Sequence, residues 1–213
     1  MRSVTRKTKS AKDERRAEAY EAVLAGLQLA LARGTSFNSL SVAELAALGG
    51  ISRSRFYAHF RDKGEFLCTW LDEVSEELAA SGAAWWTLGP DPTYSEVRAA
   101  LAQLVDSYGA HTGMMSALTD AAVYDADVSS QLAQFVEQNI SALARHIEQG
   151  QREGWIDTDL LARPTAEWLI CMTERTLGQA VSRASADETD REIDAFTYIV
   201  WHVLYAAAAD TTG

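Results

Sequence analysis

The chain has 213 residues, a net charge of −11, six tryptophans and two cysteines, Cys68 and Cys171. Two distant cysteines are too few for a disulfide framework or a cysteine-rich metal site. Charges interrupt every apolar stretch before it reaches membrane-spanning length. These features indicate one or two domains in a reducing cytoplasm.

The charge is divided unevenly along the chain. Residues 1–65 hold 12 Lys and Arg and 7 Asp and Glu, whereas residues 66–213 hold 7 Arg and 23 Asp and Glu. Such asymmetry suggests that the basic end meets nucleic acid, while the acidic part repels it. Residues 1–12 form a basic flexible arm, which is either a further DNA contact or a solvated tail. This arm is too polar for a secretory signal.

Residues 13–61 are predicted to form a three-helix domain. The first helix covers about 13–33. Ser41 and Glu44 then match a capping box, in which each side chain accepts a hydrogen bond from the backbone N–H of the other residue. This box begins the second helix of the domain.

A tight turn separates the second helix from the third. Gly49 can take the left-handed conformation that ends a helix, and Gly50 keeps the turn tight. Ser52 is the N-cap candidate for a third helix over about 53–59. So short a connection is typical of a helix-turn-helix. The alternative is an ordinary helical hairpin.

The exposed positions of the third helix favour DNA binding over that alternative. A recognition helix presents its N-terminal residues to base edges in the major groove, and here these are Arg53, Ser54 and Arg55. Arginine can bridge guanine O6 and N7, and serine can serve several bases. Tyr57 points outward toward phosphate, and Lys63 lies in the first turn of the next helix, where a phosphate can bind.

Residues 62–213 are predicted to form a helical ligand-binding and dimerisation domain, which gives the all-α chain about nine helices. The last helix is apolar on nearly all sides, so it must be buried on more than one face. We expect a second copy of the chain to supply part of that burial; the alternative is a central helix in a monomer. The predicted helices cover about 62–84, 94–110, 113–123, 126–153, 164–183 and 187–209.

Every tryptophan lies beyond residue 65. Aromatic walls with adaptable methionines are used in small-molecule pockets, although in helices such residues more often form core. Because a DNA-binding regulator must respond to a signal, we expect a ligand pocket between the predicted helices 62–84, 94–110, 126–153 and 164–183.

The segment 41–67 resembles the signature of the TetR family of bacterial transcriptional regulators. Gly64 departs from the acidic residue that usually follows the lysine. Farther along, Thr173-Glu174-Arg175-Thr176-Leu177 and the ending with Ile199, Trp201 and Tyr205 are similar to a mycobacterial repressor of that family. The family motifs are Ala43-Glu44-Leu45-Ala46, Gly50-Ile51-Ser52, Tyr57-Ala58-His59-Phe60 and Lys63-Gly64-Glu65-Phe66-Leu67.

The resemblance implies a homodimer that pairs through the last two helices and binds a palindromic double-stranded operator. It also implies release when a hydrophobic small molecule binds. With the residue patterns above, it gives the DNA-binding set Ser41, Ser52, Arg53, Ser54, Arg55, Tyr57, His59 and Lys63. The ligand-binding set is Leu104, Tyr108, Met114, Trp168, Ile170, Met172, Thr173 and Trp201.

Two other functions remain open. An enzyme with an appended DNA-binding head would use His111, His146 or His202 as a base and Cys171 as a nucleophile. No metal spacing, phosphate loop or nucleophile elbow accompanies them, so we predict no catalysis, no metal and no cofactor. A DNA-binding activator or architectural protein without a small-molecule input is the second alternative.

Overall fold

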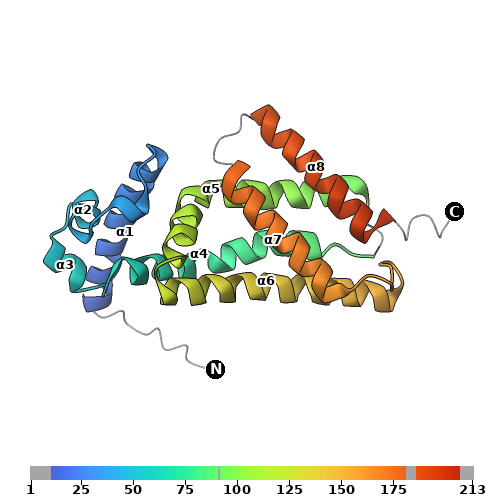
Figure 1. Cartoon of the computed structure of the whole chain (residues 1–213), viewed down its shortest axis with the longest axis horizontal. Helices are drawn as coiled ribbons and strands as arrows, with labels where there is room; N and C mark the ends of the chain where they lie inside the picture. The colour runs from blue at the N-terminus through green and yellow to red at the C-terminus, as the bar shows by residue number, and fades with distance from the viewer. Residues whose placement is uncertain (1–10, 91, 181–185, 207–213) are drawn as a thin grey trace, which may run out of the picture.

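The computed structural model describes residues 11–90, 92–180 and 186–206 (Figure 1). All regular secondary structure in this part is helical, which confirms the all-α class. None of these helices is long and apolar enough to cross a membrane. The elements are α1 (Ala11–Ala32), a 3-10 helix η1 (Phe37–Ser39), α2 (Val42–Leu48), α3 (Arg53–Tyr57), α4 (Lys63–Trp86), α5 (Tyr94–Ala122), α6 (Ala126–Glu153), α7 (Ala162–Ala180) and α8 (Ala186–Leu204).

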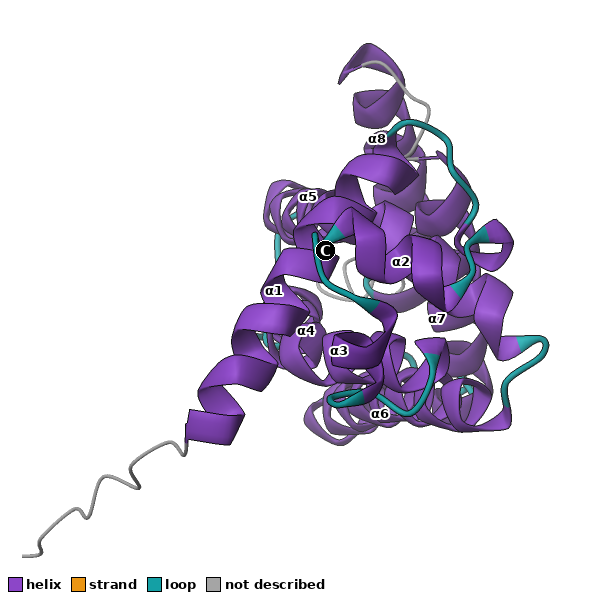
Figure 2. Ribbon diagram, turned by 90° about the vertical axis from the view of Figure 1, so that its left-hand side faces the viewer, coloured by secondary structure: helices purple, strands orange, loops and turns teal. Residues whose placement is uncertain are grey.

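The helices form two groups that α4 joins. The head consists of α1, α2 and α3 and lies at the left of Figure 1. The bundle consists of α4 to α8, and Figure 2 shows it behind the head. Within the bundle α4 packs on α5 and α6, α7 on α6, and α8 on α5. Because α4 begins at the head and runs into the bundle, it can transmit movement between the two groups.

An aromatic cluster holds the head together. Phe56 and Phe60 are buried with ring centroids 5.2 Å apart, and Phe60 lies 5.3 Å from Phe66. Tyr20 of α1 also packs on Phe66, at 5.3 Å. Tilted and edge-to-face pairs of this kind suit the charge distribution of aromatic rings. Since Phe66 belongs to α4, the same cluster attaches the head to the bundle.

The prediction of separate helices over 94–110 and 113–123 is wrong, because α5 is continuous from Tyr94 to Ala122. The expected break falls at Gly113. A Cβ atom at this position would lie 3.3 Å from Cβ of Leu31, so the glycine allows α5 to approach α1 closely. The structure therefore has eight α-helices in its described residues, against about nine expected.

Local signals place most other boundaries correctly. Thr93 and Glu96 form a capping box at the start of α5, and Gly154 ends α6 with a left-handed φ of 84°. Pro164 lies in the first turn of α7, where its missing N–H costs no helical bond. The predicted helix ends at 183 and 209, and nearly all of the predicted arm 1–12, lie outside the described residues.

Candidate functional site

Two reciprocal hydrogen bonds between Ser41 and Glu44 stabilise the start of α2. The Ser41 hydroxyl accepts a hydrogen bond from the Glu44 N–H at 3.2 Å, and the Glu44 carboxylate accepts one from the Ser41 N–H at 2.8 Å. This is the predicted capping box. The hydrogen bond from the Ser41 backbone lowers the pKa of Glu44. The Ser41 hydroxyl is thus partly occupied within the protein.

The two glycines after α2 exchange their expected roles. Gly50, not Gly49, has the left-handed φ of 65°. A Cβ atom on Gly49 would lie 2.6 Å from the backbone nitrogen of Val23. Gly49 therefore allows the end of α2 to rest directly on α1, while Gly50 turns the chain toward α3.

The helix α3 covers Arg53–Tyr57 and is two residues shorter than predicted. The Ser52 hydroxyl caps it by accepting a hydrogen bond from the Arg55 N–H at 3.1 Å. The Arg53 guanidinium lies over the Tyr57 ring, 5.5 Å from its centroid, and Tyr57 is exposed.

The outer face of α3 is polar and basic. Arg53, Ser54 and Arg55 are exposed, and Phe56 anchors the helix from below. Arg55 lies 4.0 Å from Glu18 across an exposed contact, and such contacts are weak in water. The arginine can therefore leave it for another acceptor. His59, beyond the end of α3, is half-buried.

Lys63 lies in the first turn of α4, as predicted, but its side chain contacts the protein itself. Its ammonium donates a hydrogen bond to the Leu40 carbonyl at 2.8 Å and lies 4.9 Å from the centroid of the Phe37 ring. Burial lowers the pKa of this lysine. The side chain thus turns inward and ties α4 to the segment after η1, instead of standing free for a phosphate.

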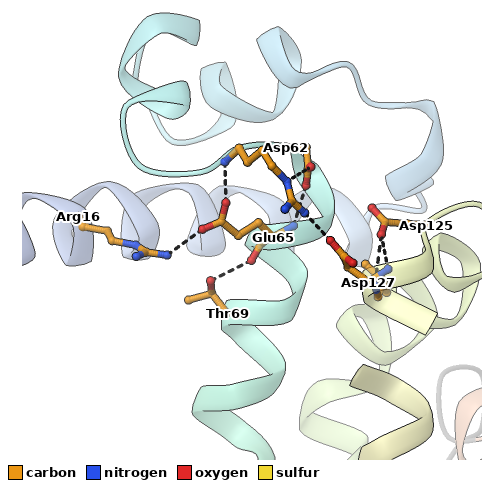
Figure 3. Close-up of polar contacts among 8 residues, drawn as sticks. Arg16, Asp62, Glu65, Thr69, Asp125 and Asp127 are labelled. Atoms are coloured by element: carbon orange, nitrogen blue, oxygen red, sulfur yellow. Dashed lines mark hydrogen bonds and ion pairs between the residues drawn. The ribbon is translucent and has the colours of Figure 1, made fainter. Parts of the chain in front are cut away.

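A polar junction connects the head to the start of α6 (Figure 3). The Arg61 guanidinium contacts Asp127 at 2.6 Å and Asp62 at 2.8 Å. The Arg61 N–H donates to Glu65 at 2.7 Å, and Glu65 also pairs with Arg16 of α1 at 3.3 Å. The junction therefore links α1, α4 and α6 at one point.

Gly64 explains how closely these helices meet. A Cβ atom at this position would overlap the carboxylate of Asp125. That carboxylate is the N-cap of α6, accepting from the N–H groups of Asp127 at 3.0 Å and Val128 at 3.2 Å. Sequence reasoning noticed Gly64 as a departure from the family pattern but missed its use as a contact between α4 and α6.

Four predicted ligand-binding residues meet around one cavity. Leu104 and Tyr108 of α5 and Ile170 and Thr173 of α7 line a hollow of about 20 Å³ deep in the bundle. α4 and α6 complete the walls. This arrangement matches the expected position of the pocket between four helices.

A larger cavity of about 380 Å³ lies beside it, between α5, α6 and α7. Its wall combines apolar residues such as Met115 and Leu132 with several polar side chains. Tyr108 and Glu174 line both cavities. These two residues therefore stand at the boundary between the deep hollow and the larger one.

The other predicted ligand-binding residues lie elsewhere. Met114 is 2% exposed and belongs to the core. Met172 lines a separate hollow of about 110 Å³ between α5, α7 and α8. The ring of Trp201 packs on Tyr94, with centroids 5.6 Å apart, and on Tyr205 at 5.9 Å.

Trp168 is a clear correction, because 79% of its surface is exposed. Ala166, Leu169, Ile170 and Thr173 of the same helix are buried. This helical spacing defines the inner face of α7, and Trp168 falls on the opposite side. The tryptophan therefore points away from both cavities.

Glu174 is a candidate functional residue that sequence reasoning missed. Its Oε1 atom is buried and has no hydrogen-bond partner. Burial raises the pKa of this carboxyl to about 7. Positions 170, 173, 174 and 177 share a face of α7, so helical spacing was the signal that could have identified it.

The candidate catalytic groups do not converge. His146 contacts the Tyr205 hydroxyl at 2.9 Å inside the core, and burial lowers the pKa of this histidine to about 4. Cys171 is exposed on α7. No group of metal-ligating side chains occurs among the described residues. The aromatic neighbours of these three histidines are Trp70 for His111, Trp155 and Tyr205 for His146, and Tyr198 for His202.

Comparison with known proteins identifies the family. The model described as "Transcriptional regulator EthR, C-terminal domain" matches residues 97–206, which is more than half of the chain. The chain belongs to the EthR-like, TetR-family transcriptional regulators. The resemblance found in the sequence is thereby confirmed.

Individual relatives agree with this assignment. EthR of Mycobacterium tuberculosis is 29% identical over 142 residues, which are 65% of this chain and 64% of EthR. The match thus spans just under two thirds of that relative. A structure described as a TetR-family regulator from Rhodococcus sp. has a TM-score of 0.67 at 22% identity, covering 88% of this chain and 98% of its own. A Saccharomonospora viridis regulator in complex with choline has a TM-score of 0.67 at 16% identity, covering 89% and 98%.

Proposed function

We propose that this EthR-like regulator is a repressor that binds a palindromic operator as a dimer and leaves it when a hydrophobic small molecule enters the bundle. The observation that carries the proposal is the combination of an exposed basic α3 with cavities beside α4. The basic α3 can bind DNA, the bundle can bind a ligand, and α4 joins these two parts. Such a repressor acts at the nucleoid in the cytoplasm.

The chemistry of α3 supports operator reading. Arg53, Ser54 and Arg55 occupy the first turn, which a recognition helix presents to base edges. Their donors suit the major groove. Ser41 and Tyr57 flank this face and are candidates for phosphate contacts. Lys63 supports the surface by holding the segment after η1 against α4.

The outer faces of α7 and α8 support a dimer. Exposed apolar side chains gather there, with 79% of Trp168 and 58% of Tyr198 accessible in the single chain. Exposed apolar side chains of this kind can form an interface. A symmetric dimer through these helices presents two α3 helices, as a palindrome requires.

The position of α4 supports a coupling between ligand and DNA. It starts beside the Lys63 contact and then lines the deep cavity with Leu78, Gly82 and Trp86. A ligand that favours one position of α4 also favours one spacing of the two heads. Its effect on the operator then equals its difference in affinity for the two states.

Fluorescence anisotropy against the DNA upstream of the protein's own gene tests this function. Saturable binding that survives scrambled competitor and weakens steeply with salt is expected. Addition of apolar compounds should release the DNA. Specific binding that no apolar compound affects would favour the alternative of an activator or architectural protein, and equal binding to scrambled DNA would contradict operator reading.

A further inference from the structure

Glu174 occupies an unusual position in the bundle. Its side chain borders the deep cavity of about 20 Å³ and the larger cavity of about 380 Å³. The Oε1 atom is shielded from solvent, yet no hydrogen-bond donor reaches it. A buried acceptor without a partner destabilises the folded protein, and more so when it is charged. The Glu174 side chain borders a space that a ligand can fill.

None of the residues that line the deep cavity with Glu174 is basic. The lining residues from α4 and α6 carry no titratable group. α5 contributes Tyr108 and the exposed Asp120, and α7 contributes Cys171 and Arg175. The charge of Glu174 raises the pKa of the Tyr108 hydroxyl further, after the larger effect of burial. Arg175 lines the larger cavity but not the deep one.

The rest of the larger cavity suits an apolar body. Met115, Leu132, Val136 and Leu177 contribute hydrophobic surface to its walls. Pockets combine mostly apolar walls with a few polar groups that fix the orientation of the ligand. Glu174 can perform this task here, because it lines both cavities and its Oε1 atom has no hydrogen-bond partner. An anionic headgroup would be repelled, and a neutral hydroxyl would gain only an ordinary hydrogen bond.

We propose that the cavity recognises amphiphilic amines, with the apolar body in the larger cavity and the protonated nitrogen paired with the Glu174 carboxylate. This assignment deepens the proposed function, because it names the chemical class of the effector, and it rests on the ligand input of that function. The ion pair compensates the charge of this half-buried carboxylate.

Direct binding without DNA tests the proposal. Isothermal titration calorimetry of the purified protein compares octylamine, octanol and octanoate at pH 8. Octylamine is expected to bind at least about tenfold more tightly than octanol, since a charge-assisted bond is stronger than a neutral one, and octanoate should bind most weakly. Equal affinities for the amine and the alcohol, or no binding of the amine, would overturn the assignment.

Two variants locate the recognition group. Glu174→Gln keeps the shape and should remove the preference for the amine. Asp120→Asn is the matched control, because Asp120 lines the same cavity but is exposed, and this variant should retain the preference. A preference that survives Glu174→Gln, or that disappears in Asp120→Asn alone, would contradict the role of Glu174.

A pH series on the unchanged protein gives a second readout. The amine pairs with the ionised carboxylate, so its affinity should fall about tenfold from pH 8 to pH 6, while the affinity of octanol stays constant. A pH-independent amine affinity would overturn the proposal. Because no DNA is present, these outcomes do not depend on operator binding, which the anisotropy experiment tests separately.

Discussion

Arg55 is held where it can read DNA without being committed to a partner inside the protein. Its N–H group completes the Ser52 cap at 3.1 Å, which fixes the start of α3. Its guanidinium has only a loose contact with Glu18 at 4.0 Å. Arg55 therefore combines an ordered backbone with a side chain that is available to contact DNA.

Arg55→Ala should weaken specific binding by about 10–100-fold and relax specificity at one operator position, since a bidentate base contact contributes about 1–3 kcal/mol. Fluorescence anisotropy with operator and scrambled DNA measures both effects. Arg145→Ala removes an exposed arginine from α6 and serves as the control. Equal losses in the two variants would show that α3 does not read bases.

Lys63→Ala should lower the stability of the protein and leave the salt dependence of DNA binding unchanged. The ammonium donates to the Leu40 carbonyl inside the protein, so its loss costs about 1 kcal/mol of unfolding free energy. Thermal unfolding and the salt slope of anisotropy titrations give the two readouts. A slope smaller by about one unit with unchanged stability would instead assign Lys63 to a phosphate.

Glu174→Gln should stabilise the protein at pH 8 and change it little at pH 4. Burial raises the pKa of the folded carboxyl to about 7, so the wild type loses stability as the pH rises from its unfolded pKa through 7. The variant avoids this loss, which amounts to about 3 kcal/mol of the free energy of unfolding. Urea unfolding at the two pH values measures the difference, and an equal effect at both would contradict a buried carboxylate.

At the scale of elements, the junction between α4 and α6 depends on a missing side chain. Gly64 leaves room for the Asp125 carboxylate, which in turn caps α6. The Arg61–Asp127 contact at 2.6 Å closes the same joint. The Asp125 cap, the absence of a side chain at Gly64 and the Arg61–Asp127 ion pair together set the distance between α4 and α6.

A double-mutant cycle tests this junction. Gly64→Ala should displace the Asp125 cap and cost about 1 kcal/mol of stability, as should Asp125→Ala. In the Asp125→Ala background the Gly64 substitution should cost much less, because the clashing carboxylate is gone. Urea unfolding of the four proteins gives the coupling energy. Strictly additive costs would rule out the close contact between these residues.

The sequence predicted elements whose signals are local. The caps at Ser41, Ser52 and Thr93 mark helix starts within a few residues, and α2, α3 and α5 begin where these caps indicate. Helix ends were harder to predict. Glycine often interrupts a helix, but Gly113 instead allows a close contact with Leu31 of α1, which depends on the folded arrangement.

The parts of the candidate site that the sequence did not predict depend on distant partners. Lys63 was expected to hold a phosphate, but its acceptor is Leu40, 23 positions earlier. The contact of Arg61 with Asp127 spans 66 positions. Trp168 was placed in the pocket by its residue type, whereas the orientation of α7 decides that it faces outward.

At the scale of the whole molecule, the exposed side of α7 and α8 supports the proposed homodimer. Trp168→Glu places a charge on the exposed side of α7 and should convert the dimer to a monomer that binds the operator far more weakly. Light scattering after size exclusion measures the mass. Tyr124→Ser, which alters an equally exposed aromatic residue after α5, should remain dimeric. A dimeric Trp168→Glu variant would place the interface elsewhere.

The central claim is that occupation of the bundle controls reading by the heads. The most direct test is fluorescence anisotropy of the wild-type protein on its operator, titrated with octylamine and compared with the Glu174→Gln variant. The account predicts specific binding by both proteins and release of the wild type at amine concentrations that leave the variant bound. Specific binding that the amine never weakens, although calorimetry shows it bound in the cavity, would contradict the claim.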